Sequence, residues 1–576
     1  MRPLLPLCLW RGAARPRLRP ARRITRTQSS SAPTALRALA CLSIGILAAL
    51  LLASCGKRDT ATGAGSSARG TTDGLLHVSV GSEPTDLDPH VVTSLSEARI
   101  LPTLFEALVN FDPDTLAPTP GLAERWDVSD DGLTYTFHLR ETQWSNGEPL
   151  VAQDVIDSWQ RVLTPSLAAD YAYFFYVIRG AEDFHKGRAK NFSGVGLVAP
   201  DSRTLVVTLT HPTPYFLQIL LNSPWRPVNV RAIARVGEAF QRGTRWTRPE
   251  NIVTSGPFRL REWTPHQHIR VEKSPTYWDA ANVQLPGLAF YPTDSVDAEE
   301  RAFRAGQLHV TYSVSLSKLT TYRRDQAASL RIDDYVNTFL FRFNTRKAPL
   351  DNPALRRALS LAIDREIITE KILKGGQKPA ASFTPPNIPG YTPPMRPVRD
   401  LAAARRLLAE AGYADGKGLP PLEILYNNSE INRIVAEAIQ EMWRRDLGIT
   451  ATLVNQEYKV VFANRRTGSY QILLGDWVAD YLDPTTFLDL WRSDSGNNHT
   501  GWSSADYDAL MNRAKATVDP AQRAALLQQA ETLMLDAAPI APIYFNTHVY
   551  LLSPSVRGWK PSPMDHIDYR HVSLAP

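Results

Sequence analysis

Three aspartates interleaved with aromatic residues stand close together in the last fifth of the chain. All of them fall within residues 475–487, and the residues concerned are Asp476, Trp477, Asp480, Tyr481 and Asp483. A short apolar run at 470–474 precedes them and predicts a strand. Ligands often bind just past the ends of strands in open α/β sheets. A carboxylate at such a place can bind a positively charged group of a ligand.

A structural role is the alternative for the same carboxylates. Asp480 and Asp483 shortly precede Pro484, and aspartates near a proline frequently order a turn. Carboxylates with shifted pKa values are also common in networks that only stabilise the fold. The stretch by itself leaves both interpretations open, so the rest of the chain has to decide between them.

The first 54 residues are predicted to be a signal peptide. Residues 1–37 contain nine arginines and no acidic residue, and an apolar run follows from 38 to 54. A basic segment followed by a short apolar segment and small residues is typical of secretory leaders. The sequence Leu52-Ala53-Ser54-Cys55 resembles a bacterial lipobox, which predicts that Cys55 is lipidated. A transmembrane anchor is the alternative, since the apolar run is just long enough to span a membrane.

Removing the leader reverses the sign of the net charge. The whole chain has 64 Lys+Arg and 58 Asp+Glu, a net charge of +6; without the nine leader arginines, 55 basic residues face 58 acidic ones, a net charge of −3. The mature chain therefore gives no support for nucleic-acid binding. Two of the three cysteines, Cys8 and Cys41, belong to the leader. After lipidation of Cys55, no thiol remains for a disulfide, a nucleophile or a metal.

The leader is followed by a predicted tether and then by a long folded part. Residues 55–74 are rich in Ser, Thr, Gly and Ala, a composition that predicts a flexible linker between the lipid and the fold. About 500 residues remain, which is too many for a single core and predicts two or three lobes.

Strand and helix patterns alternate along this folded part. Strands are predicted at 76–81, on both sides of an Asp-Gly turn within 122–140, at 204–209 and at 269–272. Helices are predicted at 95–108, 152–163, 400–411, 430–447 and 520–537. A further helix is predicted to begin with Asn352 as its cap and Pro353 as its first residue, to present apolar residues through Ile367, and to end at Gly375-Gly376. This alternation favours α/β lobes.

Motifs spread over almost the whole mature chain are specific to one family when their order and spacing are taken together. They are Glu83-Pro84 through Asp88-Pro89-His90; Trp144 through Gly147 with Asp154-Val155; Ser158 through Arg161; Ser255 through Phe258; Glu272 through Trp278; Asn352 through Arg365; Leu425-Tyr426-Asn427; Leu453 through Glu457; and Trp477 through Phe487. With these residues the chain resembles the oligopeptide-binding proteins of bacterial ABC importers. That family is the peptide and nickel class, family 5, of the extracytoplasmic solute-binding proteins.

The resemblance implies a three-lobed α/β periplasmic binding fold, type II and cluster C-like, with two hinge strands and a central ligand cleft. Mapped by the motifs, lobe I comprises 75–105, 230–336 and 547–576, lobe II comprises 106–229, and lobe III comprises 337–546. The hinge crossings are expected near 335–337 and 547–549. Two crossing strands permit rigid-body closure, since only a few backbone dihedrals have to change.

The resemblance also implies which residues contact the ligand. An extended peptide is expected in the cleft, with its amino terminus bound by Asp480, and losing either partner of that shielded pair would cost about 3–5 kcal/mol. The expected aromatic contacts are Trp477, Tyr458 and Tyr171 or Tyr173, and the candidates for the peptide carboxylate are Arg465 and Arg466. Ordinary core packing is the alternative for the aromatics, and a solvated surface position is the alternative for the arginines.

The chain departs from the family pattern at places that bear on peptide length. Leu474 stands where the best-known relatives have an arginine that binds the carboxylate of short peptides. Asn432 stands where they have a histidine further along the ligand path. The resemblance therefore leaves the preferred peptide length open.

Two other classes of function compete with this interpretation. A hydrolase is disfavoured because the chain has neither a Gly-x-Ser-x-Gly elbow nor a His-Glu-x-x-His motif. The pair His266 and His268 is weak evidence for a metal site, and we expect no metal, no cofactor and no catalytic residue. A protein of the same fold could bind a murein peptide, a nickel chelate, haem or a sugar instead, and a chaperone-like role is a weaker possibility.

The expected partners follow from the same resemblance. They are an oligopeptide, an ABC permease with its ATPase subunits, and a membrane reached through the N-terminal lipid. We expect a monomer on the periplasmic side of the cell envelope and no nucleic-acid partner.

Overall fold

The computed structural model describes residues 73–575, which all belong to one compact unit. The predicted signal peptide, the lipidation site Cys55 and nearly all of the predicted tether lie outside the described residues. Within residues 73–575, no helix is both long and apolar enough to cross a bilayer.

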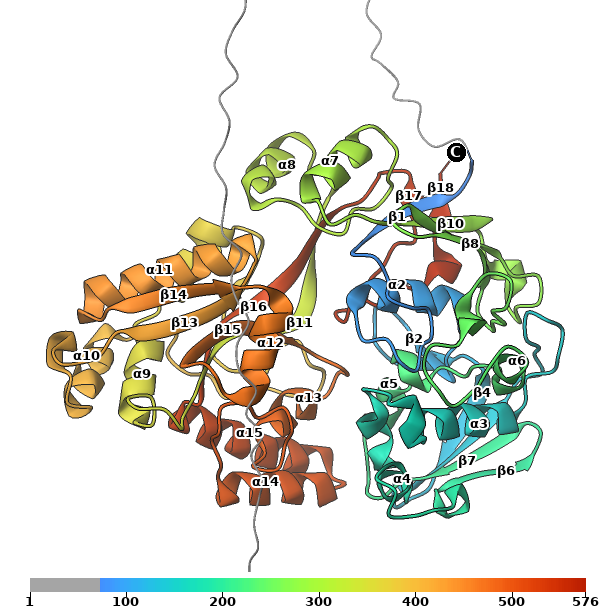
Figure 1. Ribbon diagram of the computed structural model, residues 1–576, viewed down its shortest axis with the longest axis horizontal. Coiled ribbons are helices and arrows are strands. Elements are labelled where there is room, and N and C mark those ends of the chain that lie inside the picture. The colour runs from blue at the N-terminus through green and yellow to red at the C-terminus, as the bar shows by residue number, and fades with distance from the viewer. Residues whose placement is uncertain (1–72, 576) are drawn as a thin grey trace, which may run out of the picture. The chain divides into compact units, whose positions relative to one another are not determined.

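The first sheet combines strands from distant parts of the chain (Figure 1). Its order is β1 (Leu76–Gly81), β10 (Gly287–Pro292), β9 (His268–Lys273) and β8 (Phe258–Thr264). Helix α2 (Leu95–Leu104) packs against it. The core under this sheet also contains Tyr550, Ile567 and Tyr569, so the C-terminal segment closes the same core that the first strand opens.

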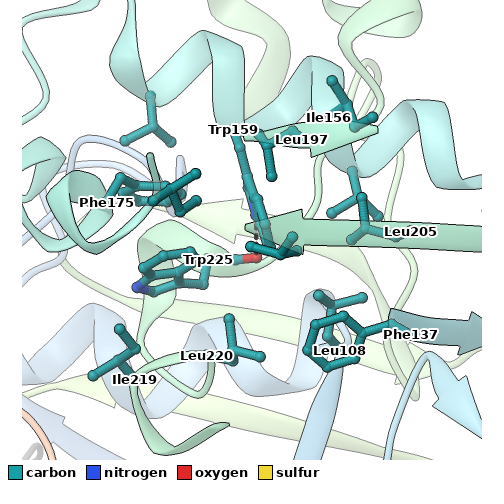
Figure 2. Packing of buried hydrophobic residues seen from close by; sticks show 14 of the residues in the cluster. Leu108, Phe137, Ile156, Trp159, Phe175, Leu197, Leu205, Ile219, Leu220 and Trp225 are labelled. Atoms are coloured by element: carbon teal, nitrogen blue, oxygen red, sulfur yellow. Dashed lines mark hydrogen bonds between the residues drawn. The ribbon is translucent and has the colours of Figure 1, made fainter. Parts of the chain in front are cut away.

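The second sheet is antiparallel and has the order β4 (Ala123–Val128), β5 (Thr134–Leu139), β7 (Thr204–Thr208) and β6 (Leu197–Asp201). Helix α3 (Ala152–Leu163) covers it with Trp159 facing inward. Figure 2 shows the centre of this core, where the Trp159 indole N–H donates to the carbonyl of Trp225 at 3.0 Å. Phe175 stacks on the Trp225 ring with centroids 3.8 Å apart. The buried Trp159 indole therefore has its hydrogen bond satisfied within the apolar cluster.

The third sheet is mixed and has six strands. Its order is β12 (Lys378–Pro379), β16 (Ile540–Leu551), β11 (Leu330–Phe343), β15 (Ile472–Val478), β13 (Leu422–Asn427) and β14 (Ala451–Gln456). Its larger helices are α9 (Pro353–Leu361), α10 (Leu401–Glu410), α11 (Glu430–Leu447), α12 (Tyr458–Thr467), α14 (Ala505–Ala516) and α15 (Pro520–Ala537).

The remaining elements are short. The helices are α4 (Ala181–His185), α5 (Phe216–Ile219), α6 (Val230–Ala234), α7 (Val296–Arg304), α8 (Leu319–Asp325) and α13 (Thr485–Leu488). The strands are β2 (Val109–Phe111), β3 (Pro118–Pro120), β17 (Val556–Arg557) and β18 (Ser573–Leu574).

Strands β11 and β16 link the third sheet to the first. They run antiparallel and side by side, with Leu330–Asp334 opposite 547–551 (Figure 1). The pairing is interrupted and resumes with Thr338 opposite Phe545, so residues 335–337 bulge against a single residue of β16. The predicted hinge crossings fall at and beside this interruption. Closure about this point, like the lobe boundaries, stays a prediction.

Local capping explains why several helices begin and end where their sequence indicates. The Ser429 hydroxyl accepts from the backbone N–H of Asn432 at the start of α11, and Gly448 ends that helix with φ at 69°. The Asp519 side chain caps α15, whose first residue is a proline.

Two helices are shorter in the structure than the sequence predicts. The helix that begins at Pro353 ends at Leu361, and a separate π-helical segment follows at Ile367–Leu373. Two side chains stabilise the break. The Asp364 carboxylate accepts from the N–H of Ile367, and the buried Arg365 guanidinium donates to the carbonyls of Ser360 and Ile363 and to the distant carbonyl of Pro542. Ile367 is 39% exposed and does not continue the buried face.

The helix predicted at 95–108 ends at Leu104. The carbonyl of Leu104 accepts from the backbone N–H groups of Ser255 and Gly256, and Phe105 is extended. The chain therefore leaves the helix to pack beside the segment before β8.

Candidate ligand-binding site

A cavity of about 1030 Å³ lies between the segment 173–219 and the segment 477–523. The residues that matter most for its chemistry are Tyr173, Tyr215, Trp477, Asp480, Tyr481 and Asp489. The two segments touch beside it. The Asn222 side-chain amide donates to the carbonyl of Asp480 at 2.8 Å, and the rings of Tyr215 and Tyr481 stack with centroids 4.6 Å apart.

Strand β15 carries the aspartate stretch to the cavity, and it extends further than the sequence indicated. It ends at Val478, so Asp476 and Trp477 belong to the strand and only Asp480 and Asp483 follow its end. Pairing with β11 holds the strand over its whole length, with Trp477 opposite Thr338. The Trp477 indole N–H donates to the carbonyl of Thr486 at 2.9 Å, which fixes the ring in the cavity wall.

Asp483 has a structural role. Arg523 donates to both of its carboxylate oxygens, at 2.7 and 2.8 Å, and the side chains of both residues are about 10% exposed. The same carboxylate accepts from the N–H and the hydroxyl of Thr485. Turn ordering, the alternative considered for the whole stretch, therefore describes Asp483.

Asp476 faces a different pocket. Its carboxylate accepts from the Asn337 amide at 2.7 Å, and its side chain is exposed. Asp476 lines a second pocket of about 320 Å³ and not the larger cavity.

Asp480 has a half-buried side chain that forms no hydrogen bond or ion pair with any residue between 73 and 575. Its backbone is fixed on both sides, because its N–H donates to the Thr486 hydroxyl at 2.9 Å and its carbonyl accepts from Asn222. Loss of water around the carboxyl raises the pKa of Asp480 to about 7. The structure thus presents a rigidly placed carboxylate to which no cation among residues 73–575 is paired.

Tyr173 stands on the opposite wall, and the Tyr171 ring lies beside it with centroids 6.1 Å apart. Burial raises the pKa values of Tyr171 and Tyr173, and the negative charge of Asp480 raises them further. Tyr173 lines the cavity with 40% of its surface exposed, and Tyr171 stacks on Phe174 with centroids 5.0 Å apart. Tyr173 is therefore open to a ligand in the cavity, whereas Tyr171 packs against the core of the second sheet.

The second pocket is positively charged. It is lined by Arg342 and Arg465, and also by Tyr458, Leu474 and Asn432. Burial, together with the neighbouring charge of Arg465, lowers the pKa of Arg342 to about 10. The Arg342 side chain donates to the carbonyl of Asp476 at 3.0 Å. A pocket of this character suits an anionic group such as a carboxylate.

The two candidate arginines of α12 lie in different environments. Arg465 is half-buried with its guanidinium 4.3 Å from the Phe462 ring, and its Nε has no partner among the described residues. Burial lowers the pKa of Arg465. Arg466 is exposed and lines neither pocket. Tyr458, the first residue of α12, is 63% exposed at the second pocket and not in the larger cavity.

One acidic residue of the cavity was missed in the sequence. Asp489 follows α13 in the run Phe487-Leu488-Asp489-Leu490-Trp491, and it lines the same cavity as Asp480. Burial raises the pKa of Asp489 to about 6, although Arg492 and Lys515 lower it. Neither its local sequence nor any motif distinguishes it from a surface aspartate.

Within residues 73–575, no group of three or more His, Cys, Asp or Glu side chains is arranged to hold a metal ion. Among the described residues, the cavity contains two unpaired carboxylates, Asp480 and Asp489, beside aromatic rings and the cations Arg492, Lys515 and Arg523, and a second pocket contains a pair of arginines.

Known proteins share this fold and sequence. The family model of the bacterial extracellular solute-binding proteins, family 5 (middle region), matches residues 117–499. The periplasmic oligopeptide-binding protein OppA of Escherichia coli is 34% identical over 86% of this chain and 91% of its own. The probable deoxycholate-binding periplasmic protein YgiS of the same organism is 34% identical over 84% and 91%.

A solved structure agrees with these sequence matches. The murein tripeptide-binding protein MppA of Escherichia coli superposes with a TM-score of 0.78 at 32% identity, covering 87% of this chain and 98% of its own. The predicted three-lobed α/β binding fold is thereby confirmed. The chain belongs to family 5 of the bacterial extracellular solute-binding proteins, which are binding proteins and not enzymes.

Proposed function

We propose that this chain is the lipid-anchored substrate-binding component of an ABC importer and that its ligands are oligopeptides. The observation that carries the proposal is the Asp480 carboxylate, which is held rigidly in a large cavity and is paired with no cation among residues 73–575. A half-buried carboxylate is stabilised when an opposite charge comes close. The ammonium group of a peptide N-terminus supplies that charge.

The second pocket supports a peptide that extends from one site to the other. Asp476 and Trp477 are neighbours in β15, yet they line the second pocket and the cavity respectively, so the two sites lie on either side of one strand. The Arg465 side chain lines that pocket and can bind an anionic group of the ligand. Leu474 and Asn432, where the family pattern has other residues, line this pocket as well, so its ligand contacts differ from those of the best-known relatives.

The proposal predicts low selectivity for the peptide sequence. Groups that every peptide shares, the amino terminus, the backbone and the carboxylate, would supply most of the affinity. A cavity of about 1030 Å³ leaves room for side chains of different size together with water. Closure about the interruption between β11 and β16 would bury the ligand and present the closed form to the permease, while ATP hydrolysis belongs to partner subunits.

Relatives support a peptide, although they do not agree on one ligand. One relative is named for oligopeptides and the solved structure for a murein tripeptide, whereas another relative is named for deoxycholate. Deoxycholate is a carboxylate without an amine, so it offers nothing to Asp480. An anionic steroid is therefore the second candidate, and the charge of the cavity disfavours it.

Calorimetric titration of the chain from residue 75 onward tests this function. The ligands are alanine peptides of two to five residues, a murein tripeptide, deoxycholate, a nickel chelate and haem. We expect peptides to bind with dissociation constants in the micromolar range or below, with one preferred length, and the non-peptides not to bind. Binding of a non-peptide without binding of any peptide would overturn the proposal.

The lipid anchor is tested separately. Full-length protein expressed in a bacterial host should fractionate with membranes, and Cys55→Ala should release it or leave it unprocessed. Membrane association that persists with a cleaved leader in the Cys55→Ala variant would contradict lipidation at this residue.

A further inference from the structure

The larger cavity contains a second carboxylate that the proposed function does not use. Asp489 lines the cavity together with Asp480, and no hydrogen bond or ion pair joins its side chain to any residue of the described range 73–575. It follows helix α13, whereas Asp480 follows strand β15, so the two carboxylates come from different elements of the wall.

Two of the three cations near Asp489 have other partners. Arg523 donates both terminal nitrogens to Asp483, and Arg492 donates to Asp494 at 3.3 Å and to Asn512 at 2.8 Å. Lys515 is the remaining cation of the wall, and it lies beyond 4.0 Å from any carboxylate of the described residues. These cations lower the pKa of Asp489, but the loss of water outweighs them.

Aromatic rings surround this end of the cavity. The charge of Asp489 raises the pKa values of Tyr215, Tyr481 and Tyr507, in each case after the larger effect of burial. Tyr215 and Tyr481 form the stacked pair that joins the two segments. Asp489 therefore lines the same cavity as this stacked pair and is half-buried there, so its carboxylate gains from a cation brought in by a ligand.

We propose that the Asp489 end of the cavity binds a second cationic group of the ligand, so that the protein prefers oligopeptides with an Arg or Lys side chain near their amino terminus. This inference rests on the proposed function, because the amino terminus at Asp480 sets the position from which the basic side chain reaches Asp489. A dibasic amino-terminal end matches the two unpaired carboxylates of the cavity. Lys515 opposes the preference, since its charge competes with that of the ligand.

The test compares arginine with citrulline, which has nearly the same shape and no charge. Tripeptides with arginine or citrulline at position 1, 2 or 3 and alanine elsewhere are titrated against wild type, Asp489→Asn and Asp506→Asn. The last variant removes a charge from an exposed residue at the start of α14, outside the cavity. In wild type, arginine should bind at least about tenfold more tightly than citrulline at one of the first two positions.

The Asp489→Asn variant should lose this preference while it still binds the citrulline peptides, and the Asp506→Asn variant should keep it. Lys515→Met should increase the preference, which provides a second reading if Asp489→Asn does not fold. Equal binding of arginine and citrulline peptides by wild type, or a preference that survives in Asp489→Asn, would overturn the inference and leave the proposed function intact. If none of the free peptides binds to wild type, the proposed function fails and the inference fails with it.

Discussion

Arg523 donates both terminal nitrogens to the carboxylate of Asp483, at 2.7 and 2.8 Å, and so neutralises one of the two aspartates that closely follow β15. Asp480, three residues earlier, has no such partner among the described residues. The same short stretch thus contains one carboxylate that stabilises the fold and one that is left for a ligand.

The Asp483–Arg523 pair should be important for stability. Its side chains are about 10% exposed, and removing one partner leaves the other charge buried without compensation. We expect Arg523→Gln to lower the free energy of unfolding by about 3–5 kcal/mol, measured by urea denaturation. Adding Asp483→Asn to that variant should cost little more. Strictly additive losses in the double variant would show that the pair does not act as a unit.

Asp480, in contrast to this pair, should lower the stability of the ligand-free protein at high pH. Its pKa is raised from 3.8 to about 7, so the folded state binds more protons than the unfolded state between those values. Stability is therefore lost as the pH rises through this window. We expect Asp480→Asn to melt at a higher temperature than wild type at pH 8 and to lose that advantage at pH 4, with Asp506→Asn as the control. An Asp480→Asn protein that is less stable than wild type at pH 8 would contradict this.

Peptide binding should depend on pH through the same group. A bound ammonium favours the ionised carboxylate, so protons compete with the ligand below the empty-state pKa of about 7. Above about pH 8 the peptide amine itself loses its proton. We expect affinity to be highest between these limits and to fall by up to about tenfold per pH unit on the acid side. The acid-side decrease should disappear in Asp480→Asn, and its persistence there would assign it to another group.

The two arginines of α12 should behave differently. Arg465 lines the positively charged pocket, whereas Arg466 is exposed outside it. We expect Arg465→Gln to weaken peptides with a free carboxylate about 10- to 100-fold, as for a charged hydrogen bond, and to leave C-terminally amidated peptides unaffected. Arg466→Gln should change the affinity for neither kind of peptide by more than about twofold. Equal effects of the two variants would remove Arg465 from the carboxylate site.

Much of the fold could be predicted because its signals are local. The bounds of α11 follow from Ser429 and Gly448, and those of α15 from Asp519 and Pro520, all of which lie next to the helices they delimit. The helix that begins at Pro353 is shorter than the sequence predicts. It ends early because the Arg365 guanidinium donates to backbone carbonyls, one of them as distant as that of Pro542. A periodic pattern does not contain such contacts.

The site was predictable only in part, for a similar reason. Sequence placed Asp476, Asp480 and Asp483 in one group, but their roles depend on partners far along the chain, Asn337 for the first and Arg523 for the last. Arg465 and Arg466 are adjacent in sequence and separate only once α12 is placed over the pocket. Asp489 carries no local signal at all, because only folding brings it to the cavity wall.

Acetylation of the peptide amine tests the central claim most directly. A peptide of the preferred length is titrated by calorimetry in its free and N-acetylated forms, against wild type and Asp480→Asn. The account predicts that wild type binds the free peptide about 10²- to 10³-fold more tightly than the acetylated one, as expected for about 3–5 kcal/mol, and that Asp480→Asn binds both equally weakly. If wild type binds the acetylated peptide as tightly as the free one, Asp480 is not the anchor of the amino terminus.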